Sequence, residues 1–195
     1  DIYADTAPQD FYIPASFWVM GEAWLATHIW EHFEYTGDKK FLEEHFEILQ
    51  ACVEFFTDFM IRADDLTLVT SPSVSPENTY IMKDGRQGCM CEGAVMDVEI
   101  LMELLEGYKK ACEVLRKPEK YRQQAEEILK ALPPLKIGKY GQLQEWQEDY
   151  EEAEPGHRHI SHLYGVYPGH SVSWKKTPKL MQAAEVTLKR RLAAG

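Results

Sequence analysis

The sequence predicts an all-α protein in which about five helices form part of a ring, with two long loops at one mouth of that ring. Apolar residues recur at helical spacing in five separate segments. Tight turns join the helices within two pairs, whereas much longer connections lead from one pair onward. These observations favour a helical toroid with functional loops at one mouth of the ring.

The first pair of helices is expected on either side of Gly37. Residues 16–35 carry apolar groups nearly all round, so we expect a helix that is buried on more than one side. Asp38 is the expected N-cap of the second helix, whose apolar residues recur every three or four positions as far as Met60. This second helix is amphipathic and is expected to pack against the first.

Three further helices complete the predicted set. Residues 94–115 show one apolar stripe, and a shorter helix begins at Pro118 and ends before Pro133. The last helix is expected to begin after Thr177 as N-cap, with Pro178 in its first position.

The two long connections are residues 62–93 and 133–176, and a short strand is expected within the first of them, at residues 66–70. Loops this long inside a compact domain usually carry function. In a ring of helices that run alternately up and down, both connections lie at the same end. We therefore expect the two loops to converge on one face, the alternative being a plain bundle with two decorative loops.

Composition and charge exclude several classes of function. The net charge of −11 argues against a nucleic-acid partner. No apolar run approaches the roughly 18 residues that a membrane span requires, so no membrane partner is expected. The spacing of the four cysteines fits neither zinc nor a disulfide scaffold, and we expect mostly reduced thiols. No nucleotide or serine-nucleophile motif is present, so no cofactor is expected. The 12% aromatic content suits sugar-stacking surfaces as well as a core.

A candidate acid lies in the first long loop. Glu77 follows two Ser-Pro steps. Each proline restricts its own backbone and that of the residue before it, which leaves the Glu77 carboxyl on a stiffened turn. A rigidly presented carboxyl is what a general acid requires. The alternative is a solvated loop residue or a turn cap.

The second long loop contains three histidines and one arginine within residues 157–162, the histidine segment. Such a cluster can bind a metal, grip an anion or hydrogen-bond the hydroxyls of a sugar. Arg158 places a fixed positive charge among the histidines, which disfavours a dication, so no metal is expected. Ligand hydrogen bonding is favoured over buried structural histidines, and the acidic run at residues 147–152 is interpreted as a solvated face.

Two aromatic residues on the first helix are further candidates. Trp24 and His28 are four positions apart, so they share a helix face and can point into the mouth of the ring. Trp18 and Trp30 are assigned to core packing.

Five segments together carry a resemblance to a known family. They are residues 21–32 (GEAWLATHIWEH), 36–38 (TGD), 75–78 (SPEN), 137–146 (IGKYGQLQEW) and 157–163 (HRHISHL). In this order, over nearly the whole chain, they resemble glycoside hydrolase family 95. The resemblance implies an (α/α)6 barrel, of which residues 1–195 are an internal fragment of the single catalytic domain. It also implies hydrolysis of terminal α-L-fucose, typically α-1,2-linked to galactose, with inversion.

The resemblance also implies roles for individual residues. Glu77 is the implied general acid, and Arg158 and His159 hold the sugar. We extend the expected sugar-binding set to four further residues: His157, Trp24, His28 and Asn78. The implied partner is a fucosylated oligosaccharide or glycoconjugate, and the open alternatives are an α-L-galactosidase or a non-catalytic carbohydrate-binding or structural module.

The same family uses Asn-x-Asn and Asp-Gly-Asn segments to activate water, and neither occurs in this chain. The resemblance implies that they lie before residue 1 and after residue 195. We therefore expect the chain by itself to be catalytically silent and prone to self-association. If a base lies inside the chain, the candidates are Glu145, Glu148 and Asp149.

Overall fold

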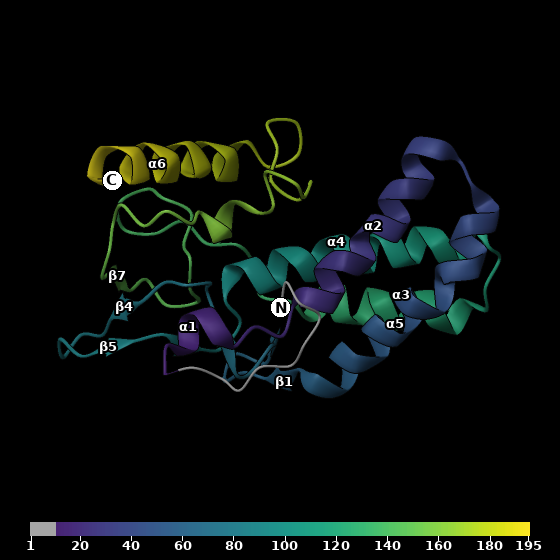
Figure 1. Cartoon of the computed structure of the whole chain (residues 1–195), viewed down its shortest axis with the longest axis horizontal. Helices are drawn as coiled ribbons and strands as arrows, with labels where there is room; N and C mark the ends of the chain where they lie inside the picture. The colour runs from purple at the N-terminus through teal and green to yellow at the C-terminus, as the bar shows by residue number, and fades with distance from the viewer. Residues whose placement is uncertain (1–10) are drawn as a thin grey trace.

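The computed structural model describes residues 11–195 and divides them into a helical half and a loop-rich half (Figure 1). The helices are α1 (Ile13–Ser16), α2 (Gly21–Thr36), α3 (Lys39–Phe59), α4 (Val95–Val114), α5 (Glu119–Ala131) and α6 (Pro178–Ala194), with a 3-10 turn η1 (Ser161–Leu163). All five predicted helices are confirmed. Within residues 11–195, no helix is both long enough and apolar enough to cross a membrane.

The predicted starts of α3 and α6 are confirmed, and the predicted start of α2 is wrong. Asp38 caps α3, because its side chain accepts a hydrogen bond from the backbone N–H of Phe41. The prediction for α2 was wrong by five residues: Phe17 is extended and separates a short α1 from the main helix. Thr177 occupies the N-cap position of α6 and Pro178 its first position, as predicted, but the Thr177 side chain makes no capping bond, because its hydroxyl accepts from the backbone N–H of Ser173.

Burial is distributed differently from the prediction. Helix α4, expected to bury one stripe, is buried all round in its first two turns and exposes only a stripe of Glu106, Lys110 and Glu113 farther along, because it packs against α2, α3, α5 and η1. Helix α2, expected to be buried on several sides, covers mainly one face in the described residues, and Leu25 on its other side is 70% exposed. The main apolar core therefore lies around α4.

The two long loops meet in small antiparallel sheets. Within the first loop β1 (Ile61–Arg62) pairs with β2 (Leu68–Val69), and β3 (Ser73–Val74) pairs with β6 (Met90–Cys91). Strand β2 confirms the predicted strand, shortened to two residues. A third sheet has the order β5 (Gln87–Gly88), β4 (Tyr80–Ile81), β7 (Glu151–Glu152).

The pairing of β4 with β7 joins the two long loops directly. Tyr80 lies opposite Glu152 and Ile81 opposite Glu151, although these strands belong to different loops. Figure 1 shows the loops on one side of α4 and the tight turns that follow α2 and α4 on the other. The predicted convergence of the loops on one face is confirmed.

Helix α6 packs on the second loop rather than on the other helices. Ala183 and Ala184 on its buried face contact Leu143 and Leu163, which form a second, smaller apolar cluster. Figure 1 accordingly shows α6 over the loop-rich half. This helix therefore supports the part of the chain in which the candidate residues lie.

Candidate functional site

Glu77 lies on a turn whose two ends are buried. In this acid turn, residues 75–78, the backbone N–H of Asn78 donates to the carbonyl of Ser75 over 2.9 Å. Ser75 and Asn78 are each 1% exposed, whereas the Glu77 side chain is 29% exposed. The turn thus presents one carboxyl from an otherwise buried segment.

The strand before the acid turn is anchored to α4 by a buried carboxyl. The hydroxyls of Thr70 and Ser73 both donate to Oδ2 of Asp97 over 2.7 Å, and Ser73 accepts from the backbone N–H of Ala94. Burial raises the pKa of Asp97 from 3.8 to about 6, although the two hydroxyl bonds lower it. The loop is therefore fixed to the first turn of α4 just ahead of Glu77.

This anchor predicts a specific pH dependence of stability. Between pH 3.8 and about 6 the folded protein keeps on Asp97 a proton that the unfolded chain releases, so stability falls as pH rises through this window, by about 3 kcal/mol at most. In Asp97→Asn we expect that contribution to be absent. Urea unfolding of the complete catalytic domain at pH 4 and pH 7 should show the variant gaining on the wild type at the higher pH. The exposed Asp64→Asn is the control, and an identical difference at both pH values for Asp97→Asn would contradict the assignment.

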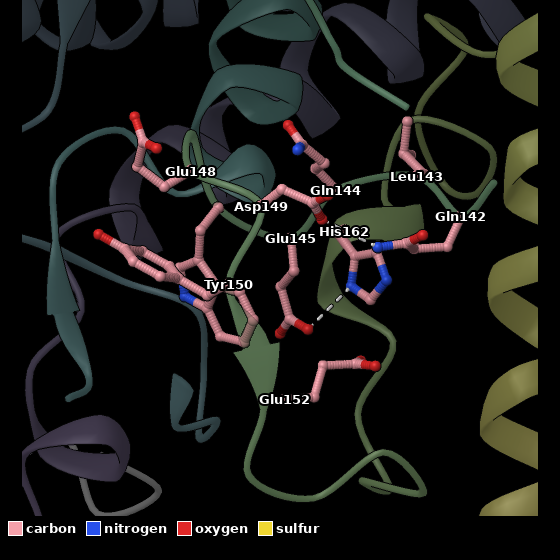
Figure 2. Close-up of a pocket in the computed structure, with 10 residues that line it drawn as sticks. Gln142, Leu143, Gln144, Glu145, Glu148, Asp149, Tyr150, Glu152 and His162 are labelled. Carbon is pink, nitrogen blue, oxygen red and sulfur yellow. Dashed lines mark hydrogen bonds and ion pairs between the residues drawn. The ribbon is translucent and has the colours of Figure 1, made fainter. Parts of the chain in front are cut away.

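The acid turn itself is held by a second buried carboxyl, Glu145. Ser75 Oγ donates to Oε1 of Glu145 over 2.6 Å, and Asn78 Nδ2 donates to Oε1 and Oε2 over 3.1 and 3.0 Å. Arg191 Nη2 on α6 lies 2.6 Å from Oε2, and His162 Nδ1 lies 3.5 Å away (Figure 2). Burial alone would raise the pKa of Glu145, but these charges and hydrogen bonds outweigh it and hold the pKa below its ordinary value.

The histidine segment meets the acid turn at Glu77. Arg158 forms an ion pair with Oε2 of Glu77, and His159 Nε2 lies 3.4 Å from the same oxygen. Ser161 Oγ donates to the carbonyl of Pro76 over 3.0 Å. The structure thus brings together the three residues for which the sequence predicts an acid and two sugar-binding groups.

An open pocket of about 430 Å³ lies beside Glu77 and His159. Its wall is aromatic: the Trp24 ring packs edge-on against Trp18 and Tyr164, with ring centroids 5.8 and 5.2 Å apart. Trp18, assigned to core packing from the sequence, packs against the core and also lines this pocket. Among the described residues that line it, Glu77 is the only carboxyl.

Four of the expected sugar-binding residues do not line this pocket. Arg158 is paired with Glu77 but is not part of the lining. Asn78 points to Glu145 because its amide is needed to hold the turn. His157 is buried, and its Nδ1 accepts from the backbone N–H of His159 over 3.1 Å, so it supports its neighbour. His28 shares a helix face with Trp24, as predicted, but lines an adjacent pocket of about 470 Å³.

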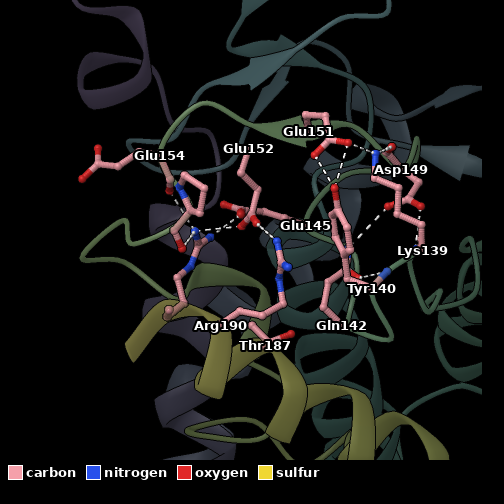
Figure 3. Close-up of polar contacts among 12 residues, drawn as sticks. Lys139, Tyr140, Gln142, Glu145, Asp149, Glu151, Glu152, Glu154, Thr187 and Arg190 are labelled. Carbon is pink, nitrogen blue, oxygen red and sulfur yellow. Dashed lines mark hydrogen bonds and ion pairs between the residues drawn. The ribbon is translucent and has the colours of Figure 1, made fainter. Parts of the chain in front are cut away.

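The acidic run at residues 147–152 is structured rather than simply solvated. Glu151 pairs with Lys139 and accepts from Tyr140, and Glu152 pairs with Arg190 on α6 (Figure 3). Asp149 accepts from the backbone N–H of Lys139 over 2.7 Å. Strand pairing explains the difference, because it places these carboxylates beside basic side chains.

The structure also bears on metals and thiols. In residues 11–195 no three His, Cys, Asp or Glu side chains are grouped so as to hold a metal ion. The third histidine of the segment, His162, is buried, with its Nδ1 beside the carboxylate of Glu145. All four cysteines are free thiols, as expected.

Sequence reasoning missed the support of the acid turn. Ser75, Asp97 and Arg191 received no role, and Glu145 was considered only as a possible base. One signal was available: Glu145 stands between Leu143 and Trp146, two buried apolar residues, and a carboxyl in such a run has to be paired. The partner on α6 had no signal in the sequence.

A carboxyl, a guanidinium and an imidazole beside an aromatic wall form the kind of site that binds sugars. The model of the glycosyl hydrolase family 95 catalytic domain matches residues 1–195, and the chain belongs to this family. It is 39% identical over 195 residues to alpha-L-fucosidase 2 of Arabidopsis thaliana, covering 98% of this chain and 23% of that protein. It is 30% identical over 156 residues to probable alpha-fucosidase A of Aspergillus niger, covering 77% of this chain and 19% of that protein. The chain thus spans less than a quarter of the length of these curated relatives.

Proposed function

We propose that this chain supplies the general-acid side of an inverting α-L-fucosidase active site. The observation that carries the proposal is that Glu77 and His159 line an aromatic pocket in which Glu77 is the only carboxyl among the described lining residues, with Arg158 paired to Glu77 beside it. The family membership and the names of the two relatives support fucose as the sugar. The complete catalytic domain is proposed to be an (α/α)6 barrel that contains this chain as one part.

In this proposal Glu77 protonates the glycosidic oxygen as the bond to the leaving sugar breaks. Inversion requires a water on the opposite face of the ring, activated by another group. In this proposal that group lies outside this chain, and the pocket lining supports this, because it offers no second carboxyl among the described residues. Of the bases considered from the sequence, Glu145 and Asp149 are engaged in hydrogen bonds elsewhere, and Glu148 does not line the pocket.

Arg158 has two partners in this mechanism. Its side chain is 69% exposed and pairs with Glu77. An acid that delivers a proton needs its carboxyl free, so the proposal requires Arg158 to turn from Glu77 to the sugar hydroxyls when substrate binds. Exposure of the guanidinium leaves room for this movement.

In this proposal the aromatic wall favours L-fucose over L-galactose. L-Fucose carries a methyl group where L-galactose carries a hydroxymethyl group, and the faces of aromatic rings contact a methyl group without the cost of removing an added hydroxyl from water. Trp18, Trp24 and Tyr164 form such a wall. The preference is proposed for α-1,2-linked fucose on galactose.

The test is hydrolysis by a complete family 95 catalytic domain that contains this chain. We expect it to release fucose from a fucosyl-lactose faster than L-galactose from the matching galactoside, with the β-anomer appearing first by NMR. The α-anomer as first product would contradict inversion. Faster release of L-galactose would favour an α-L-galactosidase, and release of neither sugar would leave a carbohydrate-binding module.

A further inference from the structure

We propose that Glu145 is a positioning residue that fixes the acid turn relative to the histidine segment and so aims Glu77 at the glycosidic oxygen. The inference rests on the proposed function, because it gives Glu145 a role through Glu77. It goes further in naming which buried group holds the acid in place. Glu145 itself touches neither the pocket nor, in this proposal, the substrate.

Glu145 accepts hydrogen bonds from the acid turn on both sides of Glu77. Ser75 lies two residues before the acid and Asn78 one residue after it, and both side chains donate to the same carboxylate. Three hydrogen bonds between 2.6 and 3.1 Å therefore fix the segment that carries the acid. Bonds to a carboxylate are stronger than bonds between neutral groups, so they restrict the turn strongly.

The same carboxylate reaches the histidine segment by two routes. His162, at the end of the segment, lies 3.5 Å from Glu145 Oε2. Arg191 donates to Glu145 and also to the carbonyls of Glu154 and Pro155, just before the segment begins. Figure 3 shows Glu145, Glu152 and Glu154 above α6, the helix to which Arg191 belongs. A single buried group thus connects the acid with the residues proposed to hold the sugar.

The surroundings of Glu145 leave it no role as a binding group. Its side chain is 4% exposed, and the cavity beside it measures about 10 Å³, which is room for no more than one water molecule (Figure 2). No sugar fits there. A charged carboxylate in such a place costs free energy unless it is paired, and here Ser75, Asn78 and Arg191 supply the partners.

Positioning of this kind matters because proton transfer depends on distance. A displacement of about 1 Å in a reacting group costs on the order of 100-fold in rate. Loss of the bonds to Glu145 frees the acid turn without removing the acid. The expected defect is therefore confined to substrates that need a proton on their leaving group.

The experiment compares two substrates in a complete domain that contains this chain: a fucosyl-lactose, whose leaving sugar needs protonation, and a nitrophenyl fucoside, whose leaving group does not. The variants are Asn78→Ala and Ser75→Ala. We expect kcat on the fucosyl-lactose to fall roughly 10- to 100-fold, with kcat on the nitrophenyl fucoside within about 3-fold of the wild type. Thr187→Val is the matched control, since Thr187 is a buried hydroxyl that bonds Leu143 and not the acid turn.

The outcomes separate this inference from the proposed function. Equal losses on both substrates in Asn78→Ala and Ser75→Ala would mean a structural role only, and unchanged kcat would mean no role; either overturns the inference while Glu77→Gln still discriminates between the substrates. If Glu77→Gln itself shows no discrimination, the acid assignment fails and the inference fails with it. Should Asn78→Ala not fold, Ser75→Ala, which removes only one hydroxyl, decides the question.

Discussion

Replacement of Glu77 by glutamine in a complete catalytic domain is expected to lower kcat on a natural α-L-fucoside about 1,000-fold, within the range that general acids contribute. A neutral amide keeps the shape of the side chain but has no acidic proton to give to the glycosidic oxygen. Fucosides with a nitrophenyl leaving group should suffer much less. Steady-state kinetics on both substrates, with unchanged thermal unfolding, would establish the role.

The control for this variant is Glu92→Gln, an exposed glutamate on the same long loop. It should leave kcat on either substrate within about 2-fold, because its charge lies outside the pocket. If Glu77→Gln hydrolysed a natural fucoside at the full rate, Glu77 would not be the general acid, and another group at the pocket would have to supply the proton.

Residues 1–195 alone are expected to release no fucose from a fucosyl-lactose. The pocket beside Glu77 has no second carboxyl among the described residues, and the water-activating segments implied by the family resemblance are not in this sequence. An acid alone cannot complete an inverting hydrolysis, because an activated water must also attack the opposite face of the sugar. Incubation of the purified chain and detection of free fucose would test this directly.

The purified chain is also expected to self-associate. Ile48 and Phe55 on α3 are each 44% exposed and lie seven positions apart on one face of the helix, and an exposed apolar helix face of this kind favours association. Light scattering on the purified chain measures it. A strictly monomeric chain would contradict the expected self-association. In the separate activity assay, fucose release at the rate of a complete domain would mean that the base lies within residues 1–195.

Much of the fold followed from local patterns. Apolar periodicity located the five helices, and Asp38 identified the start of α3 because an N-cap acts within one turn. The convergence of the long loops followed from the alternation of helix direction. The start of α2 was missed because the apolar run at residues 17–20 continues the helical pattern, whereas Phe17 is extended.

The candidate site was partly predictable for the same reason. The Ser-Pro steps indicated a stiff turn at Glu77, and the structure places Arg158 and His159 against it. The direction of Asn78 could not be predicted, because it depends on Glu145 in another loop. Helical spacing correctly placed His28 on the face of Trp24 but could not decide which of two adjacent pockets that face serves.

Because β4 pairs with β7, the two long loops have to be exchanged together when related proteins are recombined. A chimaera that takes residues 62–93 from a relative and keeps the native second loop must recreate the pairing of Tyr80 with Glu152 and Ile81 with Glu151. It must also match the bonds of Ser75 and Asn78 to Glu145. Recombination between relatives should therefore succeed when both loops are transplanted together with α6, and efforts to change specificity by swapping a single loop should yield poorly assembled proteins.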